Sequence, residues 1–471
     1  MLEGKIPINL SYCSNLRILR LRGNKLIGMI PWELGSLMTL VGLGLAINNL
    51  TGVIPASFGN ISSLRYFSVG DNKLMGIIPH DLGRLKRLKF FEVEVNNLSG
   101  EIPLSLYNIS SMSFFAVVKN HFKGTLPPNI GCTLPNLQEF HFGLNEFSGM
   151  IPGSFANATR LQLLDVSSNK FYGQVPANLG SLPDLRRLVL ENNSLGNYSA
   201  NSLDFIPSLI NCSQLEILGF AINNFGGALP NSIANLSTHL TLLLLGGNHI
   251  SGNISATLEN LVNLTILGMS HNLFTGDIRA SLGKFRNLQA LDLSVNTLSG
   301  KIPSSMGNLT RMFELYLDHN RFKGTLPPNF ANFQNLQFLS VSNNILSGTI
   351  PKGVFSLFPS IQLEFSHNSF TGSLPAEVGK LKNINILDFS ENNMTDEIPE
   401  TIGDCQTLES LNLRGNLFQG SMRSSLASLR GLRYLDLSRN NFAGQIPLGL
   451  EKFPFLSYLN LSFNDLEGEV P

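Results

Sequence analysis

The chain has 471 residues, of which 43% are hydrophobic and only 14% charged, and its 33 Lys and Arg residues equal its 33 Asp and Glu residues in number. Without a basic excess, neither nucleic acid nor anionic lipid is expected as a partner. No stretch reaches the roughly 18 apolar residues of a membrane-spanning helix, and the first residues lack the apolar run of a signal peptide. We therefore expect no direct membrane insertion by this chain, and neither a signal peptide nor an anchor of its own.

The four cysteines, Cys13, Cys132, Cys212 and Cys405, are far apart and form no Cys-x-x-Cys pair. This pattern argues against both a disulfide framework and a zinc site. Three of them, Cys13, Cys212 and Cys405, each lie three residues before a leucine of the repeat described next. We expect these three to be small buried thiols at one repeated position.

One motif recurs from the beginning of the chain to its end. Its first copy is Leu16-x-x-Leu19-x-Leu21-x-x-Asn24, and its last is Leu456-x-x-Leu459-x-Leu461-x-x-Asn464. Successive asparagines are 24 residues apart in fifteen of eighteen intervals, 25 apart in two, and 30 apart only between Asn193 and Asn223. In chain order the nineteen asparagines are Asn24, Asn48, Asn72, Asn96, Asn120, Asn145, Asn169, Asn193, Asn223, Asn248, Asn272, Asn296, Asn320, Asn344, Asn368, Asn392, Asn416, Asn440 and Asn464.

Each copy of the motif predicts a short strand that ends in a turn. Apolar residues five and three before the Asn alternate with other residues, which is the period of a strand with one buried face. Stacked copies would pair these strands into one long parallel sheet over a continuous leucine interior. Because the Asn amide both donates and accepts hydrogen bonds, we expect it to point inward and to bridge the backbones of successive coils.

Two further columns complete the repeat. Gly lies four residues after the Asn in seventeen of nineteen copies and Pro lies seven after it in fifteen. The exceptions are Asn197 and Asp396 in the Gly column and Ala200, Ser255, Arg279 and Arg423 in the Pro column. Gly permits the left-handed backbone of a tight turn, and Pro fixes φ where no backbone donor is needed. A second short strand and then a 3-10 or helical turn are therefore expected in each copy.

These columns together predict a leucine-rich-repeat solenoid, right-handed and curved, with about 19 coils of 24 residues. A parallel sheet would line its concave side, with short second strands and 3-10 or helical turns toward the convex side. We expect a single domain over residues 1–471, with one irregular 30-residue coil at 193–223. Solenoids need capping units with a polar outer face, and the sequence has none at either end, so we expect a piece of a longer protein or a truncated gene product.

The second half of the coil resembles the plant-specific leucine-rich repeat. The plant-specific pattern occurs, for example, in the run Asn296-Thr297-Leu298-Ser299-Gly300-Lys301-Ile302-Pro303, followed by Met306-Gly307-Asn308-Leu309. This resemblance covers the whole chain.

The outward positions of the predicted inner sheet, six, four, two and one residues before each Asn, should form one exposed array. Most of them hold Ser, Gly or Ala, as at Ser270 and Ser390. In chain order the first departure is in the coils ending at Asn96 and Asn120, which offer Phe90, Glu92, Glu94, Phe114, Val118 and Lys119. We take these six as a secondary candidate patch for ligand binding, and a solvated polar face remains the alternative.

The 30-residue coil has a narrower resemblance. The runs Asn192-Asn193-Ser194-Leu195-Gly196-Asn197 and Leu209-Ile210-Asn211-Cys212-Ser213-Gln214-Leu215 are similar to ectodomains of the plant receptor-kinase subfamily that contains the elongation-factor-Tu receptor and the rice bacterial-blight-resistance receptor. The resemblance implies a parent protein with a signal peptide, Cys-paired caps, a membrane helix and a Ser/Thr kinase domain, none of which is expected within this chain. It also implies a microbial peptide bound on the solenoid and a leucine-rich-repeat co-receptor kinase near the C-terminal coils.

The second departure from small outward residues is our main candidate for the ligand-binding site. The coil ending at Asn320 offers Glu314, Tyr316, Asp318 and His319, and its flanks offer Asp292, His271, Phe338, Glu364 and His367. An aromatic side chain beside ionic ones suits the anchor site of a peptide, although a polar face that clusters by chance is again the alternative. The three histidines recur on alternate coils, about 10 Å apart, so no metal site is predicted.

Fifteen Asn-x-Ser/Thr sequons occur in the chain. Six of them lie opposite the predicted inner sheet and are our candidates for N-glycosylation: Asn60, Asn108, Asn157, Asn211, Asn235 and Asn308. The repeat itself generates Asn-x-Ser, so no single sequon is proof of modification. Their concentration away from the inner sheet nevertheless suits a secreted protein whose binding face is bare.

Sequence signatures of catalysis are missing. The chain has no phosphate-binding Gly-x-x-x-x-Gly-Lys-Ser/Thr, no His-Glu-x-x-His, no Gly-x-Ser-x-Gly and no kinase His-Arg-Asp or Asp-Phe-Gly. We therefore predict no catalytic residues, no cofactor and no enzyme activity in this chain.

The predicted function is that of the ligand-binding extracellular region of a plant receptor-like kinase. It would recognise a peptide or protein of microbial origin on the concave face, in innate immune signalling. The parent protein would be a Ser/Thr kinase, with this region at the extracellular face of the plasma membrane. The alternative is a soluble leucine-rich-repeat inhibitor of a microbial cell-wall-degrading enzyme, which the length of the chain disfavours.

Overall fold

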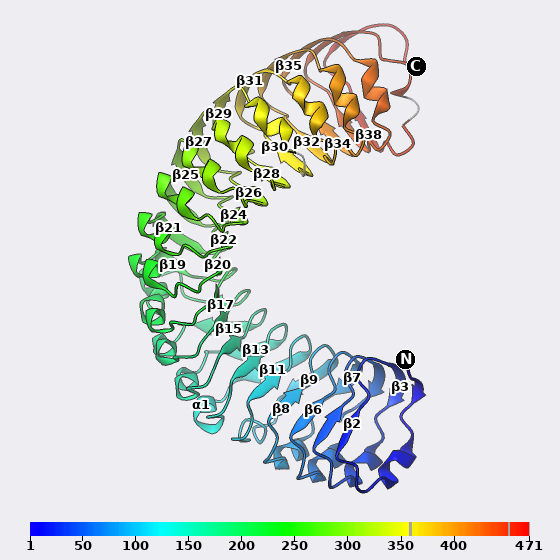
Figure 1. Ribbon diagram of the computed structural model, residues 1–471, viewed down its shortest axis with the longest axis vertical. Helices are drawn as coiled ribbons and strands as arrows, with labels where there is room; N and C mark the ends of the chain where they lie inside the picture. Colours follow the sequence, from blue (N-terminus) through cyan, green and yellow to red (C-terminus); the bar gives the residue numbers. More distant parts are fainter. Residues whose placement is uncertain (358–359, 451–452, 471) are drawn as a thin grey trace. The chain divides into compact units, whose positions relative to one another are not determined.

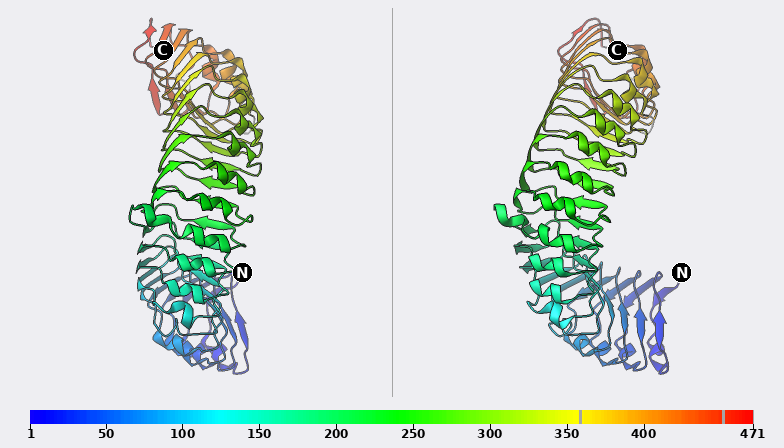
Figure 2. Two further views of the ribbon diagram at one scale, coloured as in Figure 1. Left: turned by 90° about the vertical axis from the view of Figure 1, so that its left-hand side faces the viewer. Right: turned by 60° about the vertical axis from the view of Figure 1, so that its left-hand side comes forward.

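The computed structural model describes residues 1–357, 360–450 and 453–470. Its backbone contacts divide the chain into two compact units, which we call unit 1 (Met1–Leu240) and unit 2 (Thr241–Pro471). Each unit is a stack of coils in which strands of neighbouring coils run side by side (Figures 1 and 2).

An inner parallel sheet lines each unit, and the even-numbered strands of Figure 1 form it. Every strand has three residues, of which the middle one is five before the ladder Asn; this residue is buried in the core in all of them except β38, and Leu291, for example, lies opposite Leu315 of the next coil. The inner strands of unit 1 are β2 (Ile18–Arg20), β4 (Gly42–Gly44), β6 (Tyr66–Ser68), β8 (Phe90–Glu92), β10 (Phe114–Ala116), β12 (Glu139–His141), β14 (Leu163–Asp165), β16 (Arg187–Val189) and β18 (Ile217–Gly219). Those of unit 2 are β20 (Leu242–Leu244), β22 (Ile266–Gly268), β24 (Ala290–Asp292), β26 (Glu314–Tyr316), β28 (Phe338–Ser340), β30 (Gln362–Glu364), β32 (Ile386–Asp388), β34 (Ser410–Asn412), β36 (Tyr434–Asp436) and β38 (Tyr458–Asn460).

The odd-numbered strands lie beside the inner sheet and form two lateral sheets, because β17 and β19 are not paired with each other. In unit 1 they are β1 (Glu3–Lys5), β3 (Lys25–Met29), β5 (Asn49–Gly52), β7 (Lys73–Gly76), β9 (Asn97–Glu101), β11 (His121–Thr125), β13 (Glu146–Gly149), β15 (Lys170–Gly173), β17 (Ser194–Leu195) and β19 (Gly226–Ala228). In unit 2 they are β21 (His249–Asn253), β23 (Leu273–Asp277), β25 (Thr297–Gly300), β27 (Arg321–Gly324), β29 (Ile345–Gly348), β31 (Ser369–Ser373), β33 (Asn393–Asp396), β35 (Leu417–Ser421), β37 (Asn441–Gly444) and β39 (Asp465–Leu466). The Gly column has the left-handed backbone that was predicted, as at Gly300 with φ of 76°, and Asp396 adopts it with φ of 66° although it has a side chain.

A 3-10 turn closes most coils on the side opposite the inner sheet. In unit 1 the turns are η1 (Ile8–Tyr12), η2 (Trp32–Ser36), η3 (Ala56–Asn60), η4 (His80–Arg84), η5 (Gly153–Asn157), η6 (Ala177–Ser181), η7 (Ala200–Leu203), η8 (Ile206–Asn211) and η9 (Asn231–Asn235), with one α-helical turn, α1 (Ile130–Thr133). In unit 2 they are η10 (Ala256–Asn260), η11 (Ala280–Lys284), η12 (Ser304–Asn308), η13 (Pro328–Asn332), η14 (Lys352–Ser356), η15 (Ala376–Lys380), η16 (Glu400–Asp404) and η17 (Ser424–Ser428). The irregular coil at 193–223 differs by holding two such turns, η7 and η8, which take up its additional residues.

The asparagine column forms the predicted ladder. The Asn296 Oδ1 atom accepts a hydrogen bond from the backbone N–H of Phe274, at 3.0 Å, in the preceding coil. Its Nδ2 group donates to the carbonyl oxygens of Met269, Leu293 and Ser294 at 3.1, 3.2 and 3.0 Å. Each such amide therefore satisfies backbone groups of two coils that would otherwise be buried without partners.

Leucine and phenylalanine side chains fill the interior between the two sheets and the turns. Phe140 and Phe142, on the inward positions of one coil, have ring centroids 3.7 Å apart and are fully buried. Cys212 and Cys405 are buried as expected, but Cys13 is exposed, and that part of the prediction was wrong. Within residues 1–471 the turn η1, which precedes Cys13, packs against η2 on one side only, so the Cys13 thiol is not covered. The leucine-rich-repeat fold and the repeat count are confirmed.

Candidate functional site

The main candidate site lies on the inner sheet of unit 2, around strand β26. Tyr316 is four residues before Asn320 and faces away from the core, whereas its neighbours Leu315 and Leu317 are fully buried. In the parallel register Asp292 of β24 lies opposite Tyr316, and Ala290 lies opposite Glu314. Glu314, Tyr316 and Asp318 are half-buried, and His319 is exposed. The sheet thus presents an aromatic ring at the level of three acidic side chains.

Tyr316 lies in a strongly negative environment. Burial, and after it the charges of Glu314, Asp292, Glu364 and Asp318 in that order of effect, together raise the pKa of its hydroxyl to about 12. A phenolate here would be repelled by four carboxylates, so the ring stays neutral and its hydroxyl remains a hydrogen-bond donor. Four acids that were selected from the sequence therefore all raise the pKa of Tyr316, which was selected with them.

Most of these carboxylates are held in place by short hydrogen bonds. The Asp292 Oδ1 atom accepts bonds from the Ser294 backbone N–H at 3.0 Å and from the Ser294 hydroxyl at 2.7 Å. Asp318 pairs with the His319 ring at 2.9 Å, and Glu364 accepts from the Gln362 amide at 2.7 Å. Among the described residues no Lys or Arg forms an ion pair with any of the four acids. The site can therefore accept a cationic group.

Three predicted residues lie beside this cluster rather than in it. Phe338 of β28 lies opposite Glu314, and its ring packs 6.3 Å from that of Phe313. His271 and His367 are two coils away on either side of His319, and within the described ranges neither side chain has a hydrogen bond or ion pair to the cluster. All three histidines have left-handed backbones, with φ of 50° or 51°, which directs the residue before each ladder Asn out of the strand.

Sequence reasoning missed two acids further along the column of Asp292 and Tyr316, of which Asp436 is only 1% exposed and adds no accessible charge. Asp388 of β32 lies opposite Glu364, and Asp436 of β36 lies opposite Asn412. Both accept hydrogen bonds from the backbone N–H two residues later, Ser390 at 2.8 Å and Ser438 at 2.9 Å, in the same arrangement as Asp292. The recurring Asp-x-Ser before the ladder Asn was the signal that could have identified them.

The secondary patch in unit 1 is organised around a row of stacked rings. Phe90 and Phe114 are 4.2 Å apart between ring centroids, and Tyr66, which the sequence analysis did not select, stacks on Phe90 at 4.4 Å. The Arg20 guanidinium lies 5.8 Å from the Tyr66 ring centroid at one end of the row, and the His141 ring lies 5.1 Å from Phe114 at the other. All three rings are six residues before a ladder Asn, so following that column would have identified Tyr66.

Glu92 and Glu94 lie beside this row, but Glu92 is only 6% exposed, which contradicts the prediction that it belongs to an exposed array. Its carboxylate accepts a 2.5 Å hydrogen bond from the Ser68 hydroxyl and lies 3.6 Å from the Arg22 guanidinium, so it is covered by its own neighbours. Burial raises the pKa of Glu94, and the adjacent Glu92 raises it further. Val118 is half-buried and Lys119 is exposed, with φ of 55°.

All six candidate sequon asparagines are exposed on the turn side of their coils. Five of them are the last residues of 3-10 turns, namely Asn60, Asn157, Asn211, Asn235 and Asn308. The Asn157 amide donates to the Cys132 sulfur at 3.2 Å, and Asn60 accepts from Arg84 at 3.3 Å. Glycosylation of these six residues remains a proposal.

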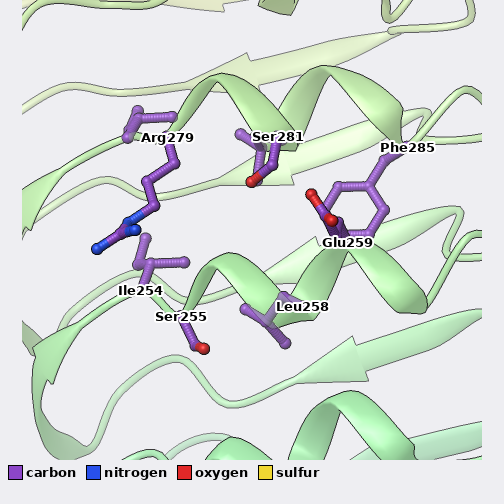
Figure 3. Close-up of a pocket in the computed structure, with 9 residues that line it drawn as sticks. Ile254, Ser255, Leu258, Glu259, Arg279, Ser281 and Phe285 are labelled. Atoms are coloured by element: carbon purple, nitrogen blue, oxygen red, sulfur yellow. The ribbon is translucent and has the colours of Figure 1, made fainter.

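A small, partly open pocket lies on the turn side of unit 2, away from the inner sheet (Figure 3). Ile254, Ser255 and Arg279 line one end of it, and Glu259 and Phe285 the other. At about 10 Å³ it has room for roughly one water molecule, so it is not a ligand site. It occurs at two successive coils in which Ser255 and Arg279 replace the usual proline.

The described ranges hold neither a candidate metal site nor a candidate membrane span. Residues 1–357, 360–450 and 453–470 contain no group of three His, Cys, Asp or Glu side chains placed to hold a metal ion. Within the same ranges, no helix has the length and apolar character that crossing a bilayer requires.

The chain matches the family model described as "Leucine Rich Repeat" in eight segments: residues 15–37, 63–85, 160–182, 287–309, 312–333, 335–357, 383–405 and 431–453. Among proteins similar in sequence is the LRR receptor-like serine/threonine-protein kinase EFR of Arabidopsis thaliana, 52% identical over 88 residues, or 19% of this chain. Receptor kinase-like protein Xa21 of Oryza sativa subsp. japonica is 43% identical over 83 residues, or 18% of this chain. Each match spans only 8% of the relative's length.

Several solved structures match the full length of this chain. The ectodomain of the Arabidopsis receptor kinase HAESA, in complex with an extended IDA peptide hormone, has a TM-score of 0.89 and 36% identity, covering 100% of this chain and 78% of that one. The plant peptide hormone receptor RGFR1, in complex with RGF2, has a TM-score of 0.87 and 32% identity with the same coverage. A further HAESA complex, with a TM-score of 0.87, contains both IDA and the co-receptor SERK1.

Proposed function

Because the chain belongs to the leucine-rich-repeat family, in the form found in plant receptor-kinase ectodomains, we propose that it is the ligand-binding extracellular region of such a kinase. It recognises a peptide or a protein segment on the inner sheet, at the outer face of the plasma membrane. A leucine-rich-repeat co-receptor kinase joins the complex near its C-terminal coils. The ligand is of microbial origin and the response is innate immunity.

The single observation that carries the proposal is the environment of Tyr316. A binding face needs an anchor that is rigid, partly desolvated and chemically distinct from the Ser and Gly residues around it. Tyr316 meets all three requirements, because it is fixed on a three-residue strand, is half-buried, and has four carboxylates around it; burial and these charges together raise the pKa of its hydroxyl to about 12.

The chemistry of the ligand follows from the same residues. Four acids without a Lys or Arg partner among the described residues attract a guanidinium or an ammonium group. The faces of Tyr316 and Phe338 offer contact to the same cation or to an adjacent apolar side chain. We therefore expect a peptide with at least one Arg or Lys next to an apolar residue.

Two comparisons support the wider proposal. The solved ectodomains that match over the full length are described in complex with peptide hormones, and one of them with a co-receptor. The microbial origin rests on the resemblance of the 193–223 coil to the subfamily of the elongation-factor-Tu receptor. A plant peptide hormone is the competing ligand class, and the experiment must separate the two.

The test is selection from a displayed peptide library in which one half tiles bacterial proteomes and the other half tiles secreted plant proteins, with the 471-residue chain as bait. We expect enriched peptides to come from the bacterial half and to pair a basic residue with an apolar one. A variant with Tyr316→Ala and Asp318→Ala should no longer enrich them. Enrichment confined to plant peptides would overturn the microbial origin, and enrichment unchanged by the double variant would overturn the site.

A further inference from the structure

A second surface of unit 1 lies outside the inner face. At the edge where strands β2, β4 and β6 begin, a groove of about 720 Å³ is lined by Arg17, Arg65 and Arg87, with Met38 and Val41 between the first two. Arg17, Val41 and Arg65 are the residues immediately before these strands, so they form one column along the edge. All three arginines are exposed.

These arginines have no partner among the described residues. Their side chains make no ion pair or hydrogen bond there, although the chain as a whole contains as many acidic as basic residues. The next residue in the same column, Lys89, is also basic, exposed and unpaired within those ranges. Adjacent strands are about 4.8 Å apart, so Arg65 and Lys89 are like charges on neighbouring coils.

The same column is neutralised elsewhere in the molecule. In unit 1, Arg186 pairs with Glu216 of the next coil at 3.2 Å. In unit 2, Arg433 pairs with Glu409 of the preceding coil at 3.1 Å. The fold therefore allows an acid to be placed beside an arginine at this edge, and the first coils of unit 1 omit it. An external anion would fill the role of the missing carboxylates.

The floor of the groove is fixed and its hydroxyl groups are already engaged. Thr39 donates to the carbonyl oxygens of Ser14 and Leu16 at 2.7 and 3.0 Å. Ser63 donates to those of Met38 and Leu40 at 2.7 and 2.6 Å. Recognition of an anion is consequently left to the guanidinium groups, whose planar donors match carboxylate oxygens.

The coil between Arg17 and Arg65 indicates which kind of anion fits. It contributes no charge but presents Met38, which is 55% exposed, and Val41. A polysaccharide with evenly spaced carboxylates would make no favourable contact with the apolar side chains of Met38 and Val41. A peptide can place an apolar side chain between acidic ones, and it thereby contacts every coil of the groove.

We propose that this groove binds an extended acidic peptide segment of a partner protein, with carboxylates on Arg17, Arg65 and Arg87 and an apolar side chain on Met38 and Val41. The interaction is separate from ligand binding at Tyr316, because it uses another face, the opposite charge and residues of unit 1 only.

The probe for the test is a fluorescein-labelled peptide, Ser-Glu-Leu-Glu-Glu-Ser, measured by anisotropy with the 471-residue chain at low salt. Replacing Arg17, Arg65 and Arg87 by Gln should weaken binding at least about tenfold, since three exposed charge pairs are lost together. The matched control replaces three exposed arginines of unit 2 that have no ion pair among the described residues, Arg286, Arg321 and Arg430, by Gln. It removes the same charge and should change the affinity less than twofold.

Two further binding measurements distinguish a specific peptide ligand from a general polyanion. A probe with Ser in place of Leu should bind more weakly, and polygalacturonate should compete poorly. Equal loss in both triple variants, or polygalacturonate binding more tightly than the peptide, would overturn the proposal. Thermal unfolding of each variant should coincide with that of the parent chain, because none of the replaced side chains enters the core.

Discussion

A ladder asparagine stabilises two coils at once. Asn296 makes four hydrogen bonds, three to carbonyl oxygens and one to an N–H, and only 9% of its surface is exposed. Asn24 is less buried, and its amide group reaches only Leu21 and Arg22 within its own coil, while its oxygen accepts from Leu2. Replacing either residue by an apolar side chain leaves backbone groups without partners, and the cost rises with burial.

Asn296→Leu should therefore lower the free energy of unfolding by about 3 kcal/mol or more, since several buried groups at about 1–3 kcal/mol each are orphaned. Asn24→Leu should cost clearly less, because water reaches the groups that it exposes. Urea denaturation of both variants measures the difference. Equal shifts of the midpoint at unchanged m-value would mean that burial of the ladder does not set its contribution.

The raised pKa of Glu94 predicts a pH-dependent stability. The folded chain binds this proton more tightly than the unfolded chain, so stability falls as pH rises from the ordinary value of 4.5 through the raised one. Glu94→Gln should consequently raise the urea midpoint near pH 7 and have little effect near pH 3.5, where both states are protonated. Glu146→Gln is the control of opposite sign, because the hydrogen bond and charge of Lys170 lower the pKa of Glu146. A destabilising Glu94→Gln at neutral pH would contradict this account.

Individual residues differ in how far the sequence could predict them. The hydrogen bonds of the ladder asparagines follow from one amide side chain at a fixed position of the repeat, and the structure has them as predicted. The burial of Glu92 could not be foreseen, because it depends on Ser68 and Arg22 in earlier coils. The left-handed φ of Lys119 and His319 was also missed, because the turn before the ladder Asn imposes it on many residue types, Ile47 and Val95 included.

Among the elements, the turns show how the proline column works. Arg279, at the start of η11, already has φ of −75° and ψ of 149°, which proline can adopt, and its N–H makes no hydrogen bond within the described part of the chain. Arg279→Pro should raise the free energy of unfolding by about 0.4–1 kcal/mol by restricting the unfolded chain.

Arg423 provides the comparison, because it occupies the equivalent position at η17 with φ of −71°. Its guanidinium pairs with Glu397 and Glu400, so Arg423→Pro loses those contacts while gaining the same restriction. We expect a smaller gain than at Arg279. Chemical denaturation of the two variants decides the point, and a loss of stability at Arg279 would show that proline is not accommodated there.

The elements themselves were largely predictable, because strand, glycine turn and 3-10 turn each follow from one column of the repeat. Two were not. The sequence did not indicate that the 193–223 coil would use its additional residues for a second 3-10 turn, since no column continues through them. The ring row of Tyr66, Phe90 and Phe114 was recognised only in part, because cross-coil stacking appears when one column is followed along the sheet.

For the whole molecule, the uninterrupted repeat leads us to propose that residues 1–471 unfold as one domain. The only tryptophan, Trp32, lies in unit 1, whereas far-ultraviolet circular dichroism reports on all coils. The two signals should give the same urea midpoint if the chain is cooperative throughout. A fluorescence midpoint well below the dichroism midpoint would instead mean that coils near Trp32 unfold separately.

Binding of a peptide ligand at Tyr316 is tested by the dissociation constant of a library-selected peptide. Tyr316→Ala with Asp318→Ala should weaken binding about thirtyfold, since loss of a central aromatic anchor typically costs about 2 kcal/mol. The matched control, Phe90→Ala with Glu94→Ala, removes an aromatic and an acid from the secondary patch of unit 1 and should change the constant less than about threefold. The reverse result, with the loss confined to the Phe90 variant, would contradict the assignment and move the site to unit 1.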